Sequence, residues 1–334
     1  RVTLLEESER VGVRKSDFYR VLQFGENAIK STAPEDLKVR FGIAIRLREK
    51  VVSADTNKRV VETSREKLRY DSLIIATGAS PTPETMRGIS KKRVYLMNSL
   101  SDYSGLSRDL GNLSTVVILG STPLALTLAE FLAKKKIGVT VFSTSLLSSY
   151  LSAPIQGILT GRLKMNGVRI VESAVDSIAG MEKVEAVVSG GTVYPCEAVV
   201  AFPRTVPKIP RIGLRLGNSG GVLVDRMMKT SQHSVFAAGD CAELQVGISS
   251  SPLRLQSAAK VMGEVAGANA AGRSEVAHLS GTLGFVAFGL EFCAAGQTLG
   301  EATRAGFDAG EFNYSEAGRE RDSDSNIVSC SLVY

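Results

Sequence analysis

Three residue types are scarce in this chain of 334 residues, which has no tryptophan, two histidines and four cysteines. The cysteines are far apart and form no CxxC pair, which argues against a disulfide framework or a zinc site and favours buried thiols. They are Cys196, Cys241, Cys293 and Cys330. His233 and His278 are also isolated in the sequence. We interpret them as surface or hydrogen-bonded histidines and not as metal ligands. We therefore expect no metal site.

Long apolar runs are also missing. No run reaches the length of a bilayer span, and no basic-then-apolar signal segment opens the chain, so we expect a cytoplasmic protein. The formal net charge is +6, but the basic residues are scattered and aromatic residues make up only 6%, which argues against nucleic-acid binding. Steering of anionic nucleotides explains the same basic excess. A hydrophobic content of 44% over this length suffices for two or three packed domains.

The N-terminal part of the chain combines a parallel strand, a helix and an antiparallel meander. Residues 2–7, VTLLEE, are an apolar run that ends in two carboxylates, which predicts a buried parallel strand. A helical pattern follows at residues 33–41. Residues 43–55 and 58–70 alternate apolar and polar side chains, which predicts antiparallel strands inserted in the first domain.

The next two strings have the patterns of α/β units. Residues 70–81, YDSLIIATGASP, are an apolar strand stopped by a small-residue turn, where backbone can approach a ligand closely. Residues 114–142 contain an apolar strand, a turn at Gly120, an amphipathic helix and another apolar strand. That order predicts a βαβ unit.

The last third of the chain changes pattern twice. Residues 220–244 give two short strands, the second of which, SVFAAGD, ends on a glycine and a carboxylate. A helix rich in small residues is expected at residues 257–272. Residues 281–297 alternate like antiparallel strands, so we expect a third domain to begin near His278.

The chain resembles the pyridine nucleotide-disulfide oxidoreductases, most closely their coenzyme A-disulfide reductase and NADH oxidase branch, because five strings occur in that family's order. They are VTLLEE, YDSLIIATGASP, the central βαβ unit, GGVLVDRMMKTSQHSVFAAGD and GTLGFVAFGLEFCAAGQTLGEATRAGF. The resemblance implies an α/β fold with two Rossmann-like dinucleotide-binding domains and a partial α+β C-terminal domain. It places an FAD domain at residues 1–108 and 226–275, an NAD(P)H domain at 109–225 and a dimerisation domain at 276–334, and so implies a homodimer.

Two segments of the family pattern are not in this sequence. The family begins with a strand and a GxGxxG turn that hold the FAD pyrophosphate, whereas this sequence starts on the following strand. A parallel sheet without that strand would leave buried backbone groups unpaired, so we expect the complete protein to contain it. The C-terminal domain likewise contains only its opening half. We expect the present chain alone to hold flavin weakly or not at all.

The resemblance assigns FAD contacts to four short segments. Glu6 or Glu7 would accept hydrogen bonds from the adenosine ribose, although such an acid is otherwise a solvated strand end. The turn of Ala76, Thr77 and Gly78 would pass close to the cofactor. The remaining candidates are Gly239 and Asp240 for the ribityl chain, or Asp240 as an N-cap, and Leu255, Gln256 and Ser257 at the start of a helix aimed at the flavin ring.

The family's redox cysteine is the first departure from the pattern. Alignment through the strand and its glutamates places Ser16 where that cysteine should be. A hydroxyl cannot cycle through thiolate, sulfenic acid and mixed disulfide, so the family route of disulfide reduction is lost unless Ser16 is an engineered replacement. Outside that alignment, Ser16 is a polar loop residue.

The second glycine motif is also altered. In the string GSTPLA, Gly120 keeps the first glycine place, while Thr122 occupies the second, where phosphate should sit, and Ala125 the third. The acid expected after the next strand is replaced by Ser143, and a later glycine turn carries Pro203. The candidate NAD(P)H contacts are Gly120, Ser121, Thr122, Leu124, Ala125 and Ser143.

Three functions remain compatible with these residues. The first is an FAD-dependent NAD(P)H oxidoreductase that passes electrons to a small-molecule acceptor without the family cysteine. The second is a non-catalytic flavoprotein or dimeric scaffold in which both redox sites have decayed. The third is a sensor that uses the altered second site for another anionic ligand such as coenzyme A.

Overall fold

The computed structural model describes the chain apart from residues 14, 83–85, 149, 247–248, 252–254, 280–281, 305, 318–326 and 334. The chain forms two compact units, each built from two segments of the sequence. Unit 1 comprises Arg1–Pro83 and Arg204–Ser280, and unit 2 comprises Glu84–Pro203 and Gly281–Tyr334. The mixture of parallel strands and helices confirms the expected α/β class, whereas the division into FAD, NAD(P)H and dimerisation domains stays a prediction.

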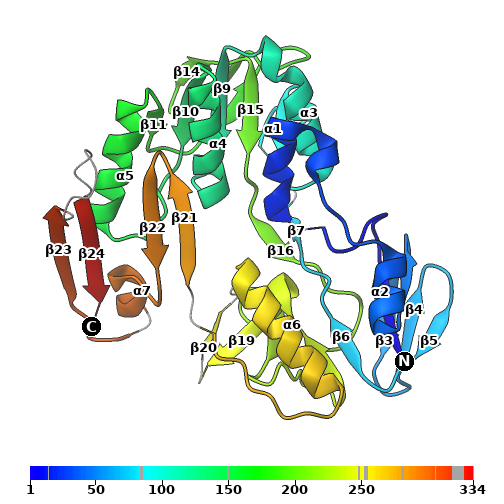
Figure 1. The fold of residues 1–334 in the computed structure, drawn as a ribbon. Coiled ribbons are helices and arrows are strands. Elements are labelled where there is room, and N and C mark those ends of the chain that lie inside the picture. The colour runs from blue at the N-terminus through cyan, green and yellow to red at the C-terminus, as the bar shows by residue number, and fades with distance from the viewer. Residues whose placement is uncertain are drawn as a thin grey trace. The chain divides into compact units, whose positions relative to one another are not determined.

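The first segment of unit 1 contains short helices and two kinds of strand pairing (Figure 1). Its elements are β1 (Val2–Glu6), η1 (Lys15–Arg20), α1 (Val21–Phe24), η2 (Glu26–Ala28), α2 (Pro34–Phe41), β2 (Ile43–Leu47), β3 (Val51–Asp55), β4 (Val60–Thr63), β5 (Lys67–Arg69), β6 (Leu73–Ile75) and β7 (Ala79–Pro81). The expected helix is confirmed as α2, which begins at Pro34 and ends before Gly42 in the left-handed conformation.

Two expectations for this segment need correction. Strand β1 is parallel to β2, as expected, but Val2 and Leu4 are 59% and 38% exposed, so β1 is not buried. Its only partner strand among the described residues is β2, so the other edge of β1 is not paired with a strand in that part of the chain. The antiparallel meander contains β3, β4 and β5 alone, because β2 pairs in parallel with β1 instead. Alternation predicts a half-exposed strand but does not name its partner.

The second segment of unit 1 supplies a helix and the partner of β6. Its elements are β16 (Thr205–Pro207), β17 (Val222–Val224), β18 (Val235–Ala237), η4 (Gly239–Cys241), β19 (Ala242–Val246), β20 (Ser249–Ser251) and α6 (Gln256–Ala270). Strand β18 pairs in parallel with β6, and α6 packs against both. The buried face of α6 recurs at helical spacing, from Ala258 through Met262 to Ala266. The expected strands and small-residue helix are therefore confirmed.

Unit 2 is organised around a parallel sheet in the order β11-β10-β9-β15-β8. Its first segment contains β8 (Val94–Leu96), α3 (Leu100–Asp109), η3 (Leu110–Asn112), β9 (Thr115–Leu119), α4 (Pro123–Lys134), β10 (Gly138–Phe142), α5 (Ala153–Met165), β11 (Arg169–Val171), β12 (Ser177–Ala179), β13 (Ala186–Ser189), β14 (Thr192–Pro195) and β15 (Ala198–Ala201). Helix α4 buries Ala125, Leu126, Ala129 and Leu132 completely. The predicted βαβ unit is confirmed as β9, α4 and β10, since β9 and β10 are parallel neighbours.

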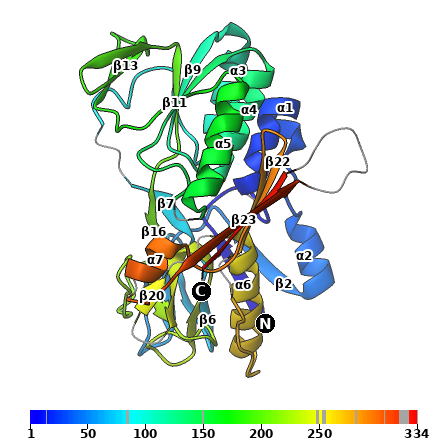
Figure 2. The same cartoon turned by 90° about the vertical axis from the view of Figure 1, so that its left-hand side faces the viewer.

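The C-terminal segment adds two hairpins and a helix to unit 2. They are β21 (Leu283–Ala287), β22 (Leu290–Ala294), α7 (Leu299–Arg304), β23 (Glu311–Ala317) and β24 (Ile327–Val333). The hairpin β21–β22 confirms the antiparallel expectation and contacts α4, where the backbone N–H of Phe288 donates to Glu130 Oε2 at 2.7 Å. The hairpin β23–β24 passes α5 (Figure 2). The hydroxyls of Ser152, just before α5, and Ser331, on β24, are hydrogen-bonded to each other.

The cysteines divide into two groups. Cys196 and Cys241 are buried, as expected, but Cys293 and Cys330 are exposed. The two exposed thiols lie on β22 and β24, one strand of each C-terminal hairpin. All four are free thiols.

Candidate functional site

The carboxyl ends of β6 and β18 bring the two predicted FAD turns together. The strands pair in register from Leu73 with Val235 to Ile75 with Ala237, so residues 76–78 and 238–240 leave the same edge. The backbone N–H of Ala238 donates to the Ile75 carbonyl at 2.9 Å and holds the strand ends together. Carboxyl edges of parallel strands are where open α/β sheets bind ligands.

Two glycines keep this edge open. Gly78 has a φ of +68°, which favours glycine, and a side chain placed on it would have no neighbour within 4 Å. Gly239 has a φ of +74°, and its nearest neighbour would be the Ala259 methyl group on α6 at 3.6 Å. The first turn of α6 therefore lies beside Gly239. Backbone at this edge is accessible to a ligand without side chains in between.

Asp240 is the acidic group of this edge. It is half-buried in η4, and its carboxylate has no hydrogen-bond or ion-pair partner among the described residues. The predicted alternative of an N-cap is not supported, because η4 has Ala238 as its N-cap and α6 has Leu255, neither with a side-chain cap. An acceptor without a protein partner fits the hydroxyls of a ribityl chain. The residues at this edge thus fit FAD.

The two glutamates at the end of β1 differ in their surroundings. Glu6 accepts the backbone N–H of Ser8 at 2.8 Å and has its other carboxylate oxygen available. Glu7 is ion-paired with Lys208, and with Lys50 at 3.3 Å. The hydrogen bond from Lys208 lowers the pKa of Glu7 below its ordinary 4.5, and Lys50 lowers it further. Glu6 is accordingly the better candidate for a ribose hydroxyl.

Lys208 is a site residue that sequence patterns did not reveal. Its backbone N–H donates to the Gly78 carbonyl at 2.9 Å, its carbonyl accepts the Thr77 hydroxyl, and its ammonium group reaches Glu7. One residue therefore ties the Ala76–Gly78 turn to the end of β1. No local signal marks it, because its partners lie far away in the sequence.

A buried carboxylate supports the same strand end. Glu49 is 1% exposed, accepts the Thr63 hydroxyl at 2.7 Å and lies 3.5 Å from Arg46 Nη1. Its backbone N–H donates to the Glu6 carbonyl at 3.0 Å. Burial and these contacts fix the loop after β2, and with it the position of Glu6.

Replacing Lys208 with methionine is expected to lower stability at pH 7 by less than about 1 kcal/mol, because both side chains of the pair with Glu7 are partly exposed to solvent. The folded-state pKa of Glu7 is depressed, so the pair stabilises the fold above pH 4.5 and loses this contribution as pH falls through the folded pKa. Urea unfolding of both proteins at pH 7 and at about pH 3 measures the difference. Lys50→Met serves as the matched control with a smaller effect. A penalty that persists undiminished at the lower pH would contradict the role of the ion pair.

Ser16 lies in the short helix η1, and its side chain is outside the described part of the structure. The place of the family redox cysteine therefore stays a prediction. The buried cysteines do not offer a replacement. Cys241 donates to the carbonyls of Ile75 and Ala238, both at 3.3 Å, and burial raises the pKa of its thiol. Burial also raises the pKa of Cys196, to about 12, so both remain protonated at neutral pH.

The altered glycine motif of unit 2 lies at the carboxyl edge of its parallel sheet. The Gly120 N–H donates to the Phe142 carbonyl at 2.8 Å, and the Phe202 N–H donates to the Leu119 carbonyl at 3.1 Å. The turn at Gly120 is therefore bordered by the ends of β10 and of β15, where Pro203 follows. Leu124 and Ala125 occupy the first turn of α4, Leu124 partly exposed and Ala125 fully buried.

Hydroxyl groups take the places that a dinucleotide would use. Thr122 is the N-cap of α4, and its hydroxyl accepts the Ala125 N–H at 3.2 Å. The hydroxyls of Ser121 and Ser143 are 2.8 Å apart, and Ser143 is only 8% exposed. The βαβ unit and Gly120 fit a nucleotide, whereas Thr122 and Ser143 provide neither phosphate space nor a ribose-binding acid. The fit to NAD(P)H is thus partial.

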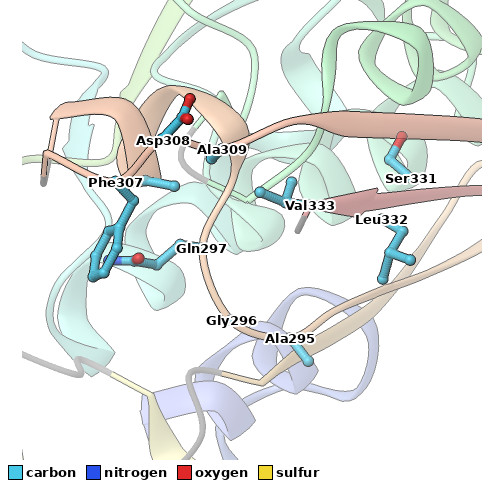
Figure 3. A pocket seen from close by; sticks show the side chains of 10 residues that line it. Ala295, Gly296, Gln297, Phe307, Asp308, Ala309, Ser331, Leu332 and Val333 are labelled. Atoms are coloured by element: carbon cyan, nitrogen blue, oxygen red, sulfur yellow. The ribbon is translucent and has the colours of Figure 1, made fainter.

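A cavity of about 410 Å³ lies apart from these predicted residues, in the C-terminal segment of unit 2 (Figure 3). It is lined by residues around Gln297 and Asp308 and by the end of β24, with the Phe307 ring close to the Gln297 side chain. None of the predicted cofactor residues lines it. We assign no ligand to this cavity.

The described residues contain neither a metal-binding cluster nor a membrane-spanning helix. No group of three His, Cys, Asp or Glu side chains is placed to hold a metal ion in that part of the chain. None of the described helices combines the length and the apolar character needed to cross a bilayer.

Comparison with known proteins places these observations in a family. The family model for the pyridine nucleotide-disulphide oxidoreductases matches residues 1–271. A relative from Pyrococcus furiosus, "NAD(P)H sulfur oxidoreductase (CoA-dependent)", is 30% identical over 82% of this chain and 65% of its own length. The "NAD(P)H coenzyme A polysulfide/persulfide reductase" of Pyrococcus horikoshii is also 30% identical, over 82% of this chain and 64% of its own length. The chain thus spans slightly less than two thirds of these relatives.

Solved structures agree on the fold. An NAD-dependent persulfide reductase from A. fulgidus superposes with a TM-score of 0.91 at 22% identity, covering 99% of this chain and 66% of its own. A water-forming NADH oxidase from Lactobacillus brevis gives a TM-score of 0.89 at 18% identity, covering 100% of this chain and 78% of its own. These similarities confirm the Rossmann-type architecture.

Proposed function

Because this chain belongs to the pyridine nucleotide-disulphide oxidoreductase family, we propose that the complete protein is an FAD-dependent NAD(P)H oxidoreductase of the coenzyme A-disulfide reductase and NADH oxidase type. The observation that carries the proposal is the shared edge of β6 and β18. There, open backbone at Gly78 and Gly239 lies beside the carboxylate of Asp240, which has no partner among the described residues. The names of the relatives, which include NAD(P)H-dependent sulfur and persulfide reductases, support the same activity class.

In this proposal, different residues of unit 1 bind different parts of FAD. Asp240 accepts a hydrogen bond from the ribityl chain, and Glu6 accepts one from the adenosine ribose. Gly78 and Gly239 let backbone approach the cofactor, with Ala76 and Thr77 shaping the turn. Gln256 and Ser257, after Leu255, place the first turn of α6 near the same edge, where its N–H groups favour partial negative charge. When bound, FAD supplies two-electron redox chemistry.

The acceptor in this proposal is a small molecule reduced without a protein thiolate. Ser16 stands at the aligned place of the family cysteine, and a hydroxyl forms neither a mixed disulfide nor a sulfenic acid. The proposal also includes the three-domain division at residues 1–108 with 226–275, 109–225 and 276–334, a homodimer formed through the C-terminal domain and a cytoplasmic location.

The absorbance spectrum of the purified full-length protein tests the proposal. We expect the bands of oxidised flavin, and bleaching of these bands when NADH or NADPH is mixed in anaerobically. Photoreduction of the same sample serves as the control that the flavin can be reduced. A flavin that photoreduction bleaches and both nucleotides leave oxidised would exclude these hydride donors.

A second candidate, a flavoprotein scaffold or sensor without catalysis, is favoured by the hydroxyls that replace phosphate and ribose contacts at Thr122 and Ser143. In that case FAD stays oxidised with every common donor. The double variant Ser16→Cys, Thr122→Gly should then gain reductase activity. A full-length double variant that binds FAD and remains inert would argue against simple decay of these two positions.

A further inference from the structure

The N-terminus of α4 is closed by a residue of its own chain. Thr122 has extended backbone, with φ −68° and ψ 159°, so no glycine is required there. In the first turn, Pro123 has no N–H and Ala125 donates to the Thr122 hydroxyl at 3.2 Å. The Leu124 N–H is left without a partner among the described residues. Of these three positions, only Leu124 therefore has an N–H group that is ready to bind a phosphate.

The turns after β9 and β10 also use their own hydroxyl groups in internal hydrogen bonds. The Ser121 hydroxyl contacts that of Ser143 at 2.8 Å and the Ser145 carbonyl at 3.2 Å. It also accepts the Leu147 N–H at 3.4 Å, while Ser143 accepts the Ser145 N–H at 3.3 Å. These bonds tie the turn after β9 to the turn after β10. The hydroxyls that border the edge are already engaged with one another.

Charge does not compensate for this closure. The sequence contains no charged residue from Leu110 to Ala129, which includes β9 and most of α4, and none from Ile137 to Gly161, which includes β10 and most of α5. Neither a carboxylate for ribose hydroxyls nor a guanidinium for phosphate comes from these segments. In these two segments, a dinucleotide pyrophosphate could be bound only by backbone N–H groups and hydroxyls, and the Thr122 hydroxyl already occupies the Ala125 N–H.

We propose that Thr122 is an intramolecular competitor of the nucleotide, so that a dinucleotide binds at this edge only when the Thr122 hydroxyl releases the Ala125 N–H. The inference rests on the proposed function, because it takes the edge of β9 and β10 as the nucleotide site. The affinity for the dinucleotide and the stability of the protein then both depend on the hydrogen bond from the Ala125 N–H to the Thr122 hydroxyl. Substitutions that remove the hydroxyl free the N–H for the ligand and remove the helix cap at the same time.

A substitution series at Thr122 separates the hydroxyl from the rest of the side chain. Serine keeps the hydroxyl, alanine removes it, and glycine removes both the hydroxyl and the side-chain volume while it remains an accepted N-cap residue. The ligand is ADP-ribose, which has the pyrophosphate but cannot transfer hydride, titrated calorimetrically against the full-length flavoprotein. Thermal unfolding of the same samples without ligand gives Tm.

We expect the Thr122 variants to rank differently in ADP-ribose affinity and in Tm. Thr122→Gly should bind ADP-ribose roughly tenfold more tightly than the parent, a change that corresponds to about 1.4 kcal/mol. Thr122→Ala should be intermediate and Thr122→Ser unchanged. In Tm, Thr122→Ala should be lowest, while glycine and serine stay close to the parent because both are accepted N-caps.

Three outcomes would overturn the inference. Equal affinities across the series would mean that the cap does not compete, and tight binding by Thr122→Ser would assign the effect to the methyl group. Absence of binding by every variant would remove the nucleotide from this edge. Tight binding of ADP-ribose by Thr122→Gly, with no bleaching of the flavin by NADH or NADPH, would instead keep the inference and reject the proposed reductase activity.

Discussion

Replacing Asp240 with alanine in the full-length protein is expected to weaken FAD binding by roughly 10- to 150-fold. The factor corresponds to the 1.5–3 kcal/mol of a hydrogen bond to a charged group. Asp240 has no partner among the described residues, so its loss leaves no protein donor unsatisfied. The stability of the flavin-free protein should therefore stay the same while flavin retention collapses.

Flavin content after extensive dialysis and thermal unfolding of the apoprotein measure the two effects of Asp240→Ala. Glu264→Ala is the matched control, because it removes the same charge from an exposed position on α6. Asp240→Asn keeps one acceptor oxygen and should retain an intermediate amount of FAD. If Asp240→Ala retained as much flavin as the Glu264 control, Asp240 would not be a cofactor ligand.

Replacing Gly217 with alanine is expected to destabilise unit 1 by about 3 kcal/mol or more. A methyl group at this position would lie 2.3–2.6 Å from the carboxylate atoms of Glu243, closer than atoms can approach. Glu243 is completely buried and accepts the N–H groups of Ser219 at 3.0 Å and of Gly221 at 3.2 Å. Although the carboxylate ends a flexible side chain, a shift away from the new methyl group would lengthen or break these two hydrogen bonds in a fully buried environment.

Equilibrium urea unfolding measures the Gly217 effect. Gly213→Ala is the control, since it lies in the same segment, has ordinary backbone and would place its methyl group in open space. The free energy of unfolding of that control should lie within about 0.5 kcal/mol of the parent's, as is usual for surface substitutions. Equal stabilities for the two alanine variants would show that Glu243 moves aside freely and that its buried contacts contribute little.

Local patterns were sufficient to predict β6 and β18, whose carboxyl ends form the proposed FAD site. The apolar runs before Ala76 and Gly239 each stop abruptly at small residues, and such runs form strands whose ends need open backbone. The structure places both where a parallel sheet requires them. The role of Thr122 as a helix N-cap could also have been predicted locally, because a threonine followed by proline is a typical helix start. The glycine motif marks Thr122 only as the residue that replaces its second glycine.

Long-range contacts were beyond such patterns. Lys208 follows a proline-rich segment, and nothing in its neighbours indicates a pair with Glu7 or bonds to Gly78 and Thr77. The partner of β2 was missed for the same reason, since alternation fits a parallel and an antiparallel neighbour equally well. The exposure of Cys293 and Cys330 was missed as well. It depends on which elements pack against each hairpin, and the hydrophobicity of a single strand does not indicate its neighbours.

The pairing of β6 with β18 has a consequence for how the chain folds. Residues 84–203, which contain the whole parallel sheet of unit 2, separate these two strands in the sequence. During synthesis β6 leaves the ribosome long before its partner, and it must remain unpaired while the intervening sheet is completed. Closing so long a loop is entropically costly and slow, so we expect the edge formed by β6 and β18 to be assembled last. Until then the apolar β6 segment is an open strand edge that a chaperone or a second chain can bind.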